Sequence, residues 1–486
     1  MPYLTAVPCR EKRLDATVAY GGGCNCLADE RRQGCLKRRE RSFSQASVCQ
    51  EWYSMFTLLT VADSALVVHG PVGCVGSAAT MNIFNRLGQA ARGARPIRSK
   101  RWFSTALTEN EVIHGGEERL RETVRAVDAR YHPKLIFVFT TCVSGIIGDA
   151  VRDVINSLQS EVDARLVLCE CEGFKTTVWA TGFDAVFHGI IHALLEPREE
   201  RIPNLVNVIS PLTVGRLDEV EIERLLGALG LEPNFIPCYA ALEDIRRTVQ
   251  ASATTCTCMT YGDYFARQLR ERYGVPFTQD VMPLGIENTD RWLRNLASLV
   301  DKSLEVGSLI AREHERIEPQ LKALRNGLAG KRVFISAGQA RAMTMSALAK
   351  ELGFELVGTT VYHYDEVIVE SVARLSKSLG NFPINIANVQ PFEQANLLRR
   401  LKPDLYLSDE MTTGWAAKQG IPTMMIYDYG MTFLGYQGVL RIGERMLHTM
   451  SNPSFSRGLQ RHKPLPYRDS WYASDPFKYL SQDGAE

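Results

Sequence analysis

The chain has 486 residues, of which 45% are hydrophobic and 23% charged, proportions that are ordinary for a globular protein with a large core. Lys and Arg number 56 against 55 Asp and Glu, so the formal net charge of +1 argues against a nucleic-acid-binding or membrane-surface protein. The N-terminal residues lack the apolar stretch of a signal peptide, and we expect a cytoplasmic protein. The 12 cysteines are therefore not expected to form disulfides.

Short apolar segments rich in Val, Ile and Phe alternate with amphipathic helical stretches along the chain. Residues 64–85 carry no charged side chain apart from His69 but contain three Gly, and we interpret them as a buried loop and helix rather than a membrane span. The predicted strands are Leu135–Thr140, Arg165–Cys169, Leu205–Ile209, Arg332–Ser336, Glu355–Val357, Ile384–Ile386, Leu405–Ser408 and Met424–Tyr427. Continuous apolar strands separated by helices predict an α/β protein with parallel sheets covered on both faces.

Composition shifts divide the chain into three predicted Rossmann-like, doubly wound domains. Boundaries are expected at Glu196–Pro203 and within Arg316–Arg332, a charged helical stretch. The predicted division is an N-terminal arm (1–48), α/β domains at 49–202, 203–328 and 329–451, and a C-terminal tail (452–486). The tail is rich in Pro and aromatic residues, which fits either wrapping around a partner subunit or a loosely ordered end.

Four cysteines stand where a strand or turn passes into a helix. Cys74 lies in a Gly/Pro-rich turn after an apolar run, and Cys142 directly follows a predicted strand. Cys49 precedes a helical stretch, and Cys258 follows the predicted helix Leu242–Gln250 and opens another one. A helix N-terminus lowers the pKa of a thiol and favours the thiolate that binds metal. These positions fit an iron–sulfur cluster, whereas the absence of a CxxC pair argues against ordinary zinc spacing.

A further group, Cys24, Cys26 and Cys35, offers three ligands without a clear fourth. This group allows a small zinc or iron site but does not establish one.

From about Cys49 to Met450 the chain resembles the catalytic α-subunit of the nitrogenase family. HGPVGC (residues 69–74) and CVSGIIGD (142–149) resemble the family's second and third P-cluster cysteine motifs, and Cys49 stands where the first belongs. CEGF (171–174) matches a segment shared by the α-subunits. CMTYGDYFARQLRERYGVPF (258–277) resembles the segment whose leading Cys ligates the active-site cluster, and its ending selects Cys258 over Cys256.

The resemblance implies two metal clusters between the domains. Cys49, Cys74 and Cys142 would supply one half of an 8Fe-7S P-cluster, with a β-like subunit supplying the other half in an α2β2 heterotetramer. His69 would support this site without being a ligand. Cys258 would hold a larger active-site cluster, and an ATP-hydrolysing 4Fe-4S iron protein would deliver the electrons. Soft thiolate ligands suit such clusters.

The sequence also departs from the nitrogenase pattern at positions that contact the cofactor. The family's Gln and His after the CEGF segment fall on Trp179 and Phe183, and an Arg falls on Asn82. In the Gly-rich loop we expect cofactor contacts from Gly338 and from Arg341, which stands one place later than in the family. The second cofactor ligand, a His, has no counterpart in the region 425–429, and the Lys that anchors the organic acid is unmatched.

These losses argue against a molybdenum–homocitrate cofactor and favour an 8Fe-9S-C cluster held by Cys258 and a second ligand that the sequence does not name. Trp179 and Phe183 would form an apolar pocket beside Cys258 for an alkyl thioether, although each one alone is more often a core residue. Candidate proton donors near strand ends are Tyr362, His363, Tyr427 and Tyr429.

The expected function is therefore that of the catalytic subunit of a nitrogenase-like methylthio-alkane reductase. Such an enzyme cleaves the carbon–sulfur bonds of small thioethers to methanethiol and hydrocarbons. The alternative is a non-catalytic scaffold for assembly of a nitrogenase-type cofactor. A third option is a tetrapyrrole reductase of the same superfamily, but these lack a buried cofactor Cys.

Overall fold

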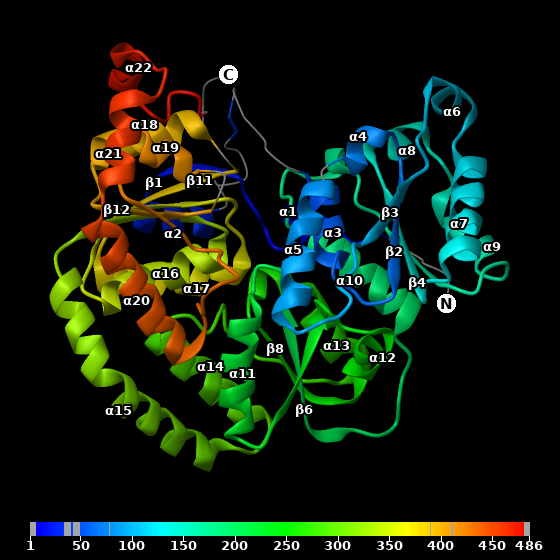
Figure 1. Ribbon diagram of the computed structural model, residues 1–486, viewed down its shortest axis with the longest axis horizontal. Helices are drawn as coiled ribbons and strands as arrows, with labels where there is room; N and C mark the ends of the chain where they lie inside the picture. The colour runs from blue at the N-terminus through cyan, green and yellow to red at the C-terminus, as the bar shows by residue number, and fades with distance from the viewer. Residues whose placement is uncertain are drawn as a thin grey trace.

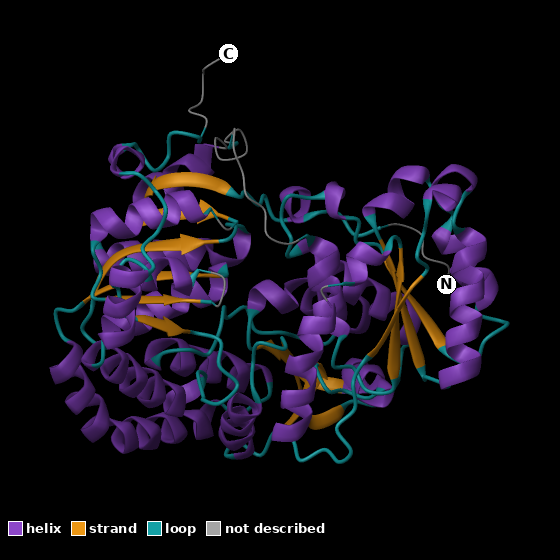
Figure 2. Cartoon of the chain, turned by 45° about the horizontal axis from the view of Figure 1, so that its top comes forward, coloured by secondary structure: helices purple, strands orange, loops and turns teal. Residues whose placement is uncertain are grey.

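The computed structural model describes residues 6–33, 40–41, 49–76, 78–388, 390–409 and 412–480, which form three helix-flanked sheets (Figure 1; Figure 2). The first sheet lies on the right of Figure 1, the third on the left and the second below and between them. In the described residues no helix is long and apolar enough to cross a membrane.

The first sheet has the strand order β3-β2-β4-β5, and all its pairs are parallel. Its central strands β2 and β4 are buried along their whole length, because helices cover both faces. The strands are β2 (Ser64–His69), β3 (Arg101–Ser104), β4 (Leu135–Thr140) and β5 (Arg165–Cys169). The accompanying helices are α3 (Gln50–Leu58), α4 (Val72–Val75), α5 (Ala78–Ala91), α6 (Glu109–His114), α7 (Glu117–Tyr131), α8 (Cys142–Ile147), α9 (Val151–Leu158) and α10 (Thr181–Leu194), with a 3-10 turn at Gly173–Lys175.

The second sheet is smaller, with the parallel order β7-β6-β8. Its strands are β6 (Ile202–Ser210), β7 (Glu232–Pro237) and β8 (Ala251–Cys256). The helices that follow in this part of the chain are α11 (Arg216–Gly227), α12 (Leu242–Arg246), α13 (Met259–Tyr273), α14 (Ile286–Leu299) and α15 (Ser303–Leu328), with a 3-10 turn at Arg247–Gln250.

The third sheet has the order β1-β11-β10-β9-β12-β13. Neighbouring strands are parallel throughout, except that the edge strand β1 pairs antiparallel with β11. Its strands are β1 (Ala19–Gly23), β9 (Arg332–Ala337), β10 (Glu355–Val361), β11 (Pro383–Ala387), β12 (Leu405–Ser408) and β13 (Thr423–Met425). The remaining helices are α1 (Arg10–Arg13), α2 (Cys24–Gln33), α16 (Gln339–Glu351), α17 (Val369–Leu379), α18 (Pro391–Leu401), α19 (Thr413–Ala417), α20 (Gly435–Ser451), α21 (Ser454–His462) and α22 (Asp469–Ala473), with a 3-10 turn at Glu366–Ile368.

The parallel sheets confirm the predicted α/β class, but several local predictions are wrong. Residues 64–85 begin with strand β2, whose apolar side chains are buried in the sheet, and are not only loop and helix. The predicted strand Met424–Tyr427 is Thr423–Met425. The charged helix begins at Ser303, well before Arg316, and Pro319 does not end it because this exposed position leaves the freed carbonyl to water.

The segments predicted to be an N-terminal arm and a C-terminal tail both contain regular secondary structure that packs on the third unit. Residues 19–23 form β1, which pairs antiparallel with β11 in the third sheet. Beyond residue 452, α21 and α22 lie beside α19 and α18 (Figure 1). The N-terminal segment therefore belongs to the same sheet as residues more than 350 positions later, since Ala19 pairs with Ala387.

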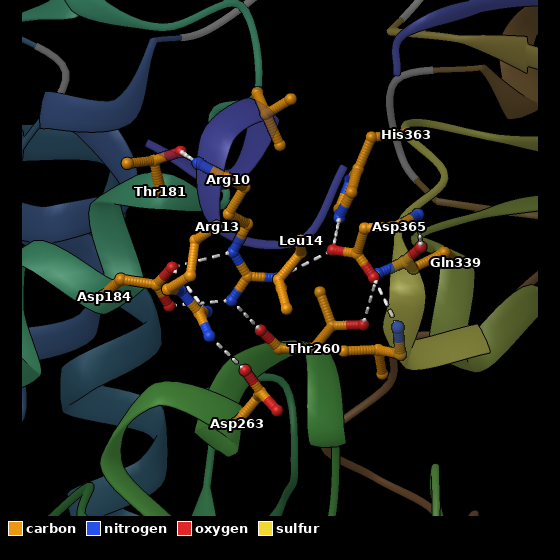
Figure 3. Close-up of polar contacts among 12 residues, drawn as sticks. Arg10, Arg13, Leu14, Thr181, Asp184, Thr260, Asp263, Gln339, His363 and Asp365 are labelled. Atoms are coloured by element: carbon orange, nitrogen blue, oxygen red, sulfur yellow. Dashed lines mark hydrogen bonds and ion pairs between the residues drawn. The ribbon is translucent and has the colours of Figure 1, made fainter. Parts of the chain in front are cut away.

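A buried polar network centred on Arg10 joins elements that carry all three sheets (Figure 3). The Arg10 side chain donates to Asp184 on α10, to the carbonyl of Thr260 on α13 and to Asp365 after β10. Arg10, Asp184 and Asp365 have no exposed surface. The α1 segment thus fastens the three units around the space between them.

Candidate functional site

The three cysteines predicted to bind a P-cluster lie at one end of the first sheet. Cys49 immediately precedes α3, Cys74 lies in α4 and Cys142 is the first residue of α8. All three thiols are free; Cys49 is exposed and the other two are half-buried. Short helices that start just beyond strands β2 and β4 bring Cys74 and Cys142 to the same edge of the sheet, because those strands are parallel neighbours.

Gly173 shows how closely two of these thiols approach each other. A Cβ at this position would lie 3.0 Å from the Cβ of Cys49 and 3.2 Å from the Sγ of Cys142. Both cysteines therefore pack against the same backbone atom, although 93 residues separate Cys49 from Cys142 in the sequence. Only glycine leaves this approach unobstructed.

Burial raises the pKa of the Cys49 and Cys74 thiols, the latter to about 11, with the neighbouring thiols and Glu51 contributing. In both thiols the effect of burial on the pKa outweighs the lowering expected at a helix N-terminus. Backbone N–H groups at the start of α3 do lower the pKa of Cys49, but desolvation outweighs them. Glu51, which the sequence analysis missed, is itself buried, and burial raises its pKa to about 8.

His69 is held away from ligation by its own partners. Its Nε2 lies 2.8 Å from an Asp149 oxygen and its Nδ1 3.2 Å from the hydroxyl of Thr105. The imidazole thereby ties the end of β2 to the segments after β3 and α8. Within the described residues no group of three His, Cys, Asp or Glu side chains is close enough to hold a single metal ion.

A second candidate site is a cavity of about 1210 Å³ between the sheets. Cys258 lies on its wall as the residue immediately before α13 and packs against both large hydrophobic cores of the protein. Burial raises the pKa of this thiol, whereas backbone N–H groups of Tyr261 and Thr260 and the cations Arg341 and Arg10 act in the opposite direction. Cys256, the alternative in the sequence, is buried at the end of β8 and does not line the cavity.

Aromatic side chains form one wall of this cavity. Trp179 stacks on Tyr53 with ring centroids 3.7 Å apart and meets Phe183 edge-on at 5.7 Å. Phe183 in turn lies 4.7 Å from Tyr261, measured between ring centroids. The structure therefore brings Trp179 and Phe183 to the same cavity as Cys258, and it adds Tyr53 and Tyr261, which the sequence analysis did not single out. Tyr53 lies in α3 and Tyr261 in α13, and an aromatic residue in an apolar helical pattern by itself indicates only a core position.

Gly338 and Arg341 lie on the same cavity. The Nη1 of Arg341 donates to the carbonyl of Ile426 at 2.6 Å, and its guanidinium lies 4.4 Å from the ring centroid of Tyr427. Its Nη2 is buried without a hydrogen-bond partner. The Arg341 side chain is thus held in position, and its Nη2 remains available to donate a hydrogen bond.

The wall formed by the end of β13 and the residues after it carries Met425, Tyr427 and Asp428. Among the described residues that line the cavity, Cys258 is the one cysteine and none is a histidine. Of the predicted proton donors, Tyr362, Tyr427 and Tyr429 line the cavity, whereas His363 does not. Asn82 is turned toward the start of β3, where its Oδ1 accepts a hydrogen bond from the backbone of Lys100 at 2.9 Å.

The cysteines near the N-terminus are not brought together. Cys24 is fully buried, with its Sγ 3.6 Å from the carbonyl of Gly380, whereas Cys26 is exposed. Cys35 lies outside the described residues. The described part of this group gives no support to a metal site.

Comparison with known proteins defines the class. The model of the family described as "Nitrogenase component 1 type Oxidoreductase" matches residues 49–451. A solved structure, "Nitrogenase Cp1 at pH 6.5", superposes with a TM-score of 0.72 over 88% of this chain and 92% of that one, at 19% identity, a likeness that concerns the fold alone.

Named relatives cover nearly the same length. The nitrogenase iron-molybdenum cofactor biosynthesis protein NifE of Nostoc sp. is 26% identical over 90% of this chain and 89% of its own length. NifE of Klebsiella pneumoniae is 27% identical over 85% and 91%. The nitrogenase molybdenum-iron protein alpha chain of Methanosarcina barkeri is 24% identical over 81% and 84%. The chain belongs to the nitrogenase component 1-type oxidoreductase family, as its resemblance to the α-subunits predicts.

Proposed function

We propose that this chain is the α-like subunit of a scaffold on which a large iron–sulfur cofactor is held during its assembly and then passed on. The observation that carries the proposal is the cavity wall, in which Cys258 is the one thiol among the described residues and no histidine faces it. A cluster anchored to this chain through one thiolate is released when one bond is exchanged. A permanent cofactor is better served by strong ligands on two sides.

The residues around the cavity fit such a cluster. Cys258 offers a soft sulfur ligand, and the unpartnered Nη2 of Arg341 is a buried donor that gains a partner when an anionic, sulfide-rich group enters. The cavity is wide enough for a polynuclear cluster and includes side chains that are open to solvent, such as Met425 and Phe455. When bound, the cluster would supply electron storage; this chain's residues bind it and exclude water.

The thiols of Cys49, Cys74 and Cys142 support a second cluster of the 8Fe-7S type. Their placement at a partly exposed edge, with Gly173 leaving room between two of them, suits a cluster completed by a partner chain. We propose a β-like partner in an α2β2 heterotetramer, and an ATP-hydrolysing iron protein as electron donor. The similarity to the cofactor biosynthesis proteins NifE of two organisms supports the scaffold over a catalytic role.

The aromatic wall favours a second candidate function, the reduction of methylthio-alkanes. Tyr53, Trp179 and Phe183 present apolar ring surface next to Cys258, a setting that accepts an alkyl thioether better than a small polar substrate. In this candidate the cluster lacks molybdenum and homocitrate and stays in place through turnover.

Two measurements distinguish the scaffold from the reductase: transfer of the cluster to an acceptor protein, and turnover of a thioether substrate. The chain is purified anaerobically with its β-like partner, its clusters are labelled with radioactive iron, and it is mixed with a nitrogenase component 1 protein that lacks its cofactor. A scaffold transfers labelled iron and activates the acceptor, and both effects are lost in Cys258→Ser but kept in Cys256→Ser. ATP-dependent release of methane or ethane from dimethyl sulfide or ethyl methyl sulfide, without transfer, would instead establish the reductase.

A further inference from the structure

A separate cavity of about 880 Å³ lies in the third unit, at the opposite ends of its strands from Cys258. Its walls come from α18, α21, the segment before β13 and the segment around α22, at the upper left of Figure 1. The residues that immediately precede the parallel strands β9, β12 and β13 line it: Lys331, Asp404 and Pro422. Residues at the other ends of the same strands line the cavity of Cys258, namely Gly338, Asp409 and Met425. The two cavities are therefore distinct, and this volume is typical of a site for a small molecule.

Basic side chains dominate the lining of this second cavity, which we call the basic cavity. Its described lining residues include a single carboxylate, Asp404, against five cations: Lys331, Arg399, Lys402, Lys418 and Arg457. In a chain whose formal net charge is +1, this is a strong local concentration of positive charge. Cations that line one space repel one another, and a bound anion lowers that repulsion.

The carboxylates next to the basic cavity are already engaged. The Oδ2 of Asp404 accepts a hydrogen bond from the backbone N–H of Arg332 at 2.8 Å, and Asp469 pairs with Arg399 at 3.2 Å. The four other lining cations are exposed and form no ion pair within the part of the chain that the structure describes. Their charged ends are thus available to a ligand.

Backbone contacts hold the walls of the basic cavity in position. The Nε2 of Gln460 on α21 donates to the carbonyl of Gln419 at 3.0 Å, which ties that helix to the segment before β13. The Nη1 of Arg332 donates to the carbonyl of Lys402 at 3.1 Å. The segments that carry the cations are therefore fixed before any ligand arrives, which lowers the entropic cost of binding.

The two tyrosines of the lining offer little stacking surface to a planar ligand. The ring of Tyr467 is stacked with those of Trp415 and Trp471, at centroid distances of 6.0 and 5.5 Å. The ring of Tyr472 lies 4.4 Å from the guanidinium of Arg399. Because these rings already have partners, recognition in the basic cavity depends on charge rather than on stacking against a base.

We infer that the basic cavity binds a compact polyphosphate, a ligand with two or three linked phosphate groups. Lysine ammonium groups act as point charges that suit phosphate oxygens, whereas the planar fork of arginine is what favours a carboxylate. Three of the four unpaired cations are lysines. The bound anion would also restrain α21, which carries Arg457 on this cavity and Phe455 on the wall of the Cys258 cavity. The site does not depend on the proposed cluster.

The test is calorimetric titration of the anaerobically purified full-length chain with inorganic tripolyphosphate, in magnesium-free buffer at about 0.15 M salt. Saturable binding is expected in wild type. The double variant Lys402→Gln/Lys418→Gln should bind at least ~10-fold more weakly, because it loses two charged donors. Lys322→Gln/Lys377→Gln, at exposed positions on α15 and α17 outside the cavity, removes the same charge and should bind as wild type does. All four lysines are exposed, and thermal unfolding without ligand checks that each variant is folded.

Two other ligands and one location measurement sharpen the assignment. ATP should bind no more tightly than tripolyphosphate, because the tyrosines are already stacked or covered, and citrate should bind more weakly than tripolyphosphate. Tripolyphosphate should slow amide hydrogen exchange in residues 418–422 and 454–462. Cys258→Ser should bind tripolyphosphate as wild type does, so failure of the proposed cluster and failure of this site are distinguishable.

Absence of saturable binding at this salt concentration, or equal affinities of the two double variants, would overturn the inference. Tighter binding of ATP or of citrate than of tripolyphosphate would contradict the assignment to a compact polyphosphate. Binding of a single-stranded DNA oligonucleotide without binding of tripolyphosphate would assign the basic cavity to a nucleic-acid surface instead, and the inference would be wrong.

Discussion

The guanidinium of Arg10 and the carboxylate of Asp184 form a two-point ion pair, 174 residues apart in sequence, with no exposed surface on either side chain. The distances are 3.1 Å from Nε and 2.8 Å from Nη2. Because Arg10 also bonds Asp365 and the carbonyl of Thr260, the pair is the centre of a junction among the three units. We therefore expect this junction to contribute to the stability of the packing around the candidate cavity.

Arg10→Gln should lower the free energy of unfolding by about 3–5 kcal/mol, because it leaves Asp365 buried without this cation and Asp184 with Arg13 alone. The measurement is urea-induced unfolding of the cluster-free chain. Lys12→Gln, at an exposed position two residues later, serves as the control and should change little. Equal effects of the two variants would contradict the role of the junction.

Cys142→Ser should remove iron from the complex, because Cys142 is free and half-buried at the edge of the first sheet. Iron content per heterotetramer and the yield of the β-like partner in co-purification check this. Cys169→Ser is the matched control, since Cys169 is fully buried at the end of the neighbouring strand β5. The prediction is wrong if both variants retain the iron content of wild type.

Gly173→Ala should reduce iron loading without unfolding the chain. The added Cβ would lie 3.0 Å from the Cβ of Cys49 and 3.2 Å from the Sγ of Cys142, so the two thiols must move apart. Gly227→Ala, where nothing lies within 4 Å of the new atom, is the control and should load normally. Iron analysis alongside thermal unfolding distinguishes a displaced site from a destabilised fold; normal loading of Gly173→Ala would show that the thiols tolerate the shift.

Because the carboxyl group of Asp218 is buried, we expect the free energy of unfolding of the chain to depend on pH. Burial raises its pKa to about 6, although backbone N–H groups of Leu434 and Phe433 oppose the shift. Because the folded-state pKa lies above the unfolded one, the folded chain binds this proton more tightly. The resulting contribution to stability is fully present below about pH 4 and is lost as the pH rises through 6.

Between pH 5 and 7.5 this loss should amount to about 1 kcal/mol in the wild-type chain. Asp218→Asn retains an acceptor for the two N–H groups but carries no titratable proton. The difference in unfolding free energy between variant and wild type should therefore move in favour of the variant as the pH rises. A difference that is independent of pH would show that Asp218 does not titrate in this range.

Where a segment's own residues decide its structure, the sequence was sufficient to predict it. Leu135–Thr140 is apolar throughout and is buried throughout, and its strand was predicted with the correct bounds. The same local logic placed Cys142 at a helix start, because the change from strand to helix is written in the residues on both sides of it. It also predicted the helix that follows Cys258, although the strand before that residue was not predicted.

Strands stabilised by distant partners were missed. The sequence of residues 251–256 is too polar to predict a buried strand. Thr255 is nevertheless buried there, because its hydroxyl group shares a hydrogen bond with the hydroxyl group of Thr278 and accepts another from the indole Nε1 of Trp292. Gly21, in the Gly-rich strand β1, is needed where Phe477 packs so closely that a Cβ would lie 2.5 Å away. These contacts override the local preferences of the residues.

The features of the candidate site fall into the same two groups, those that the local sequence predicts and those that only distant contacts decide. The sequence alone determined the fold class and the family, because strand patterning and motif order are local properties of the chain. Its assignment of the cluster-binding cysteines stays a prediction. Only the tertiary structure decided that Trp179 lies against His363 and that Arg10 holds Asp365 beside that imidazole. Those residues belong to different units, and their proximity follows from how the three sheets pack, a consequence of many weak contacts that no single segment encodes.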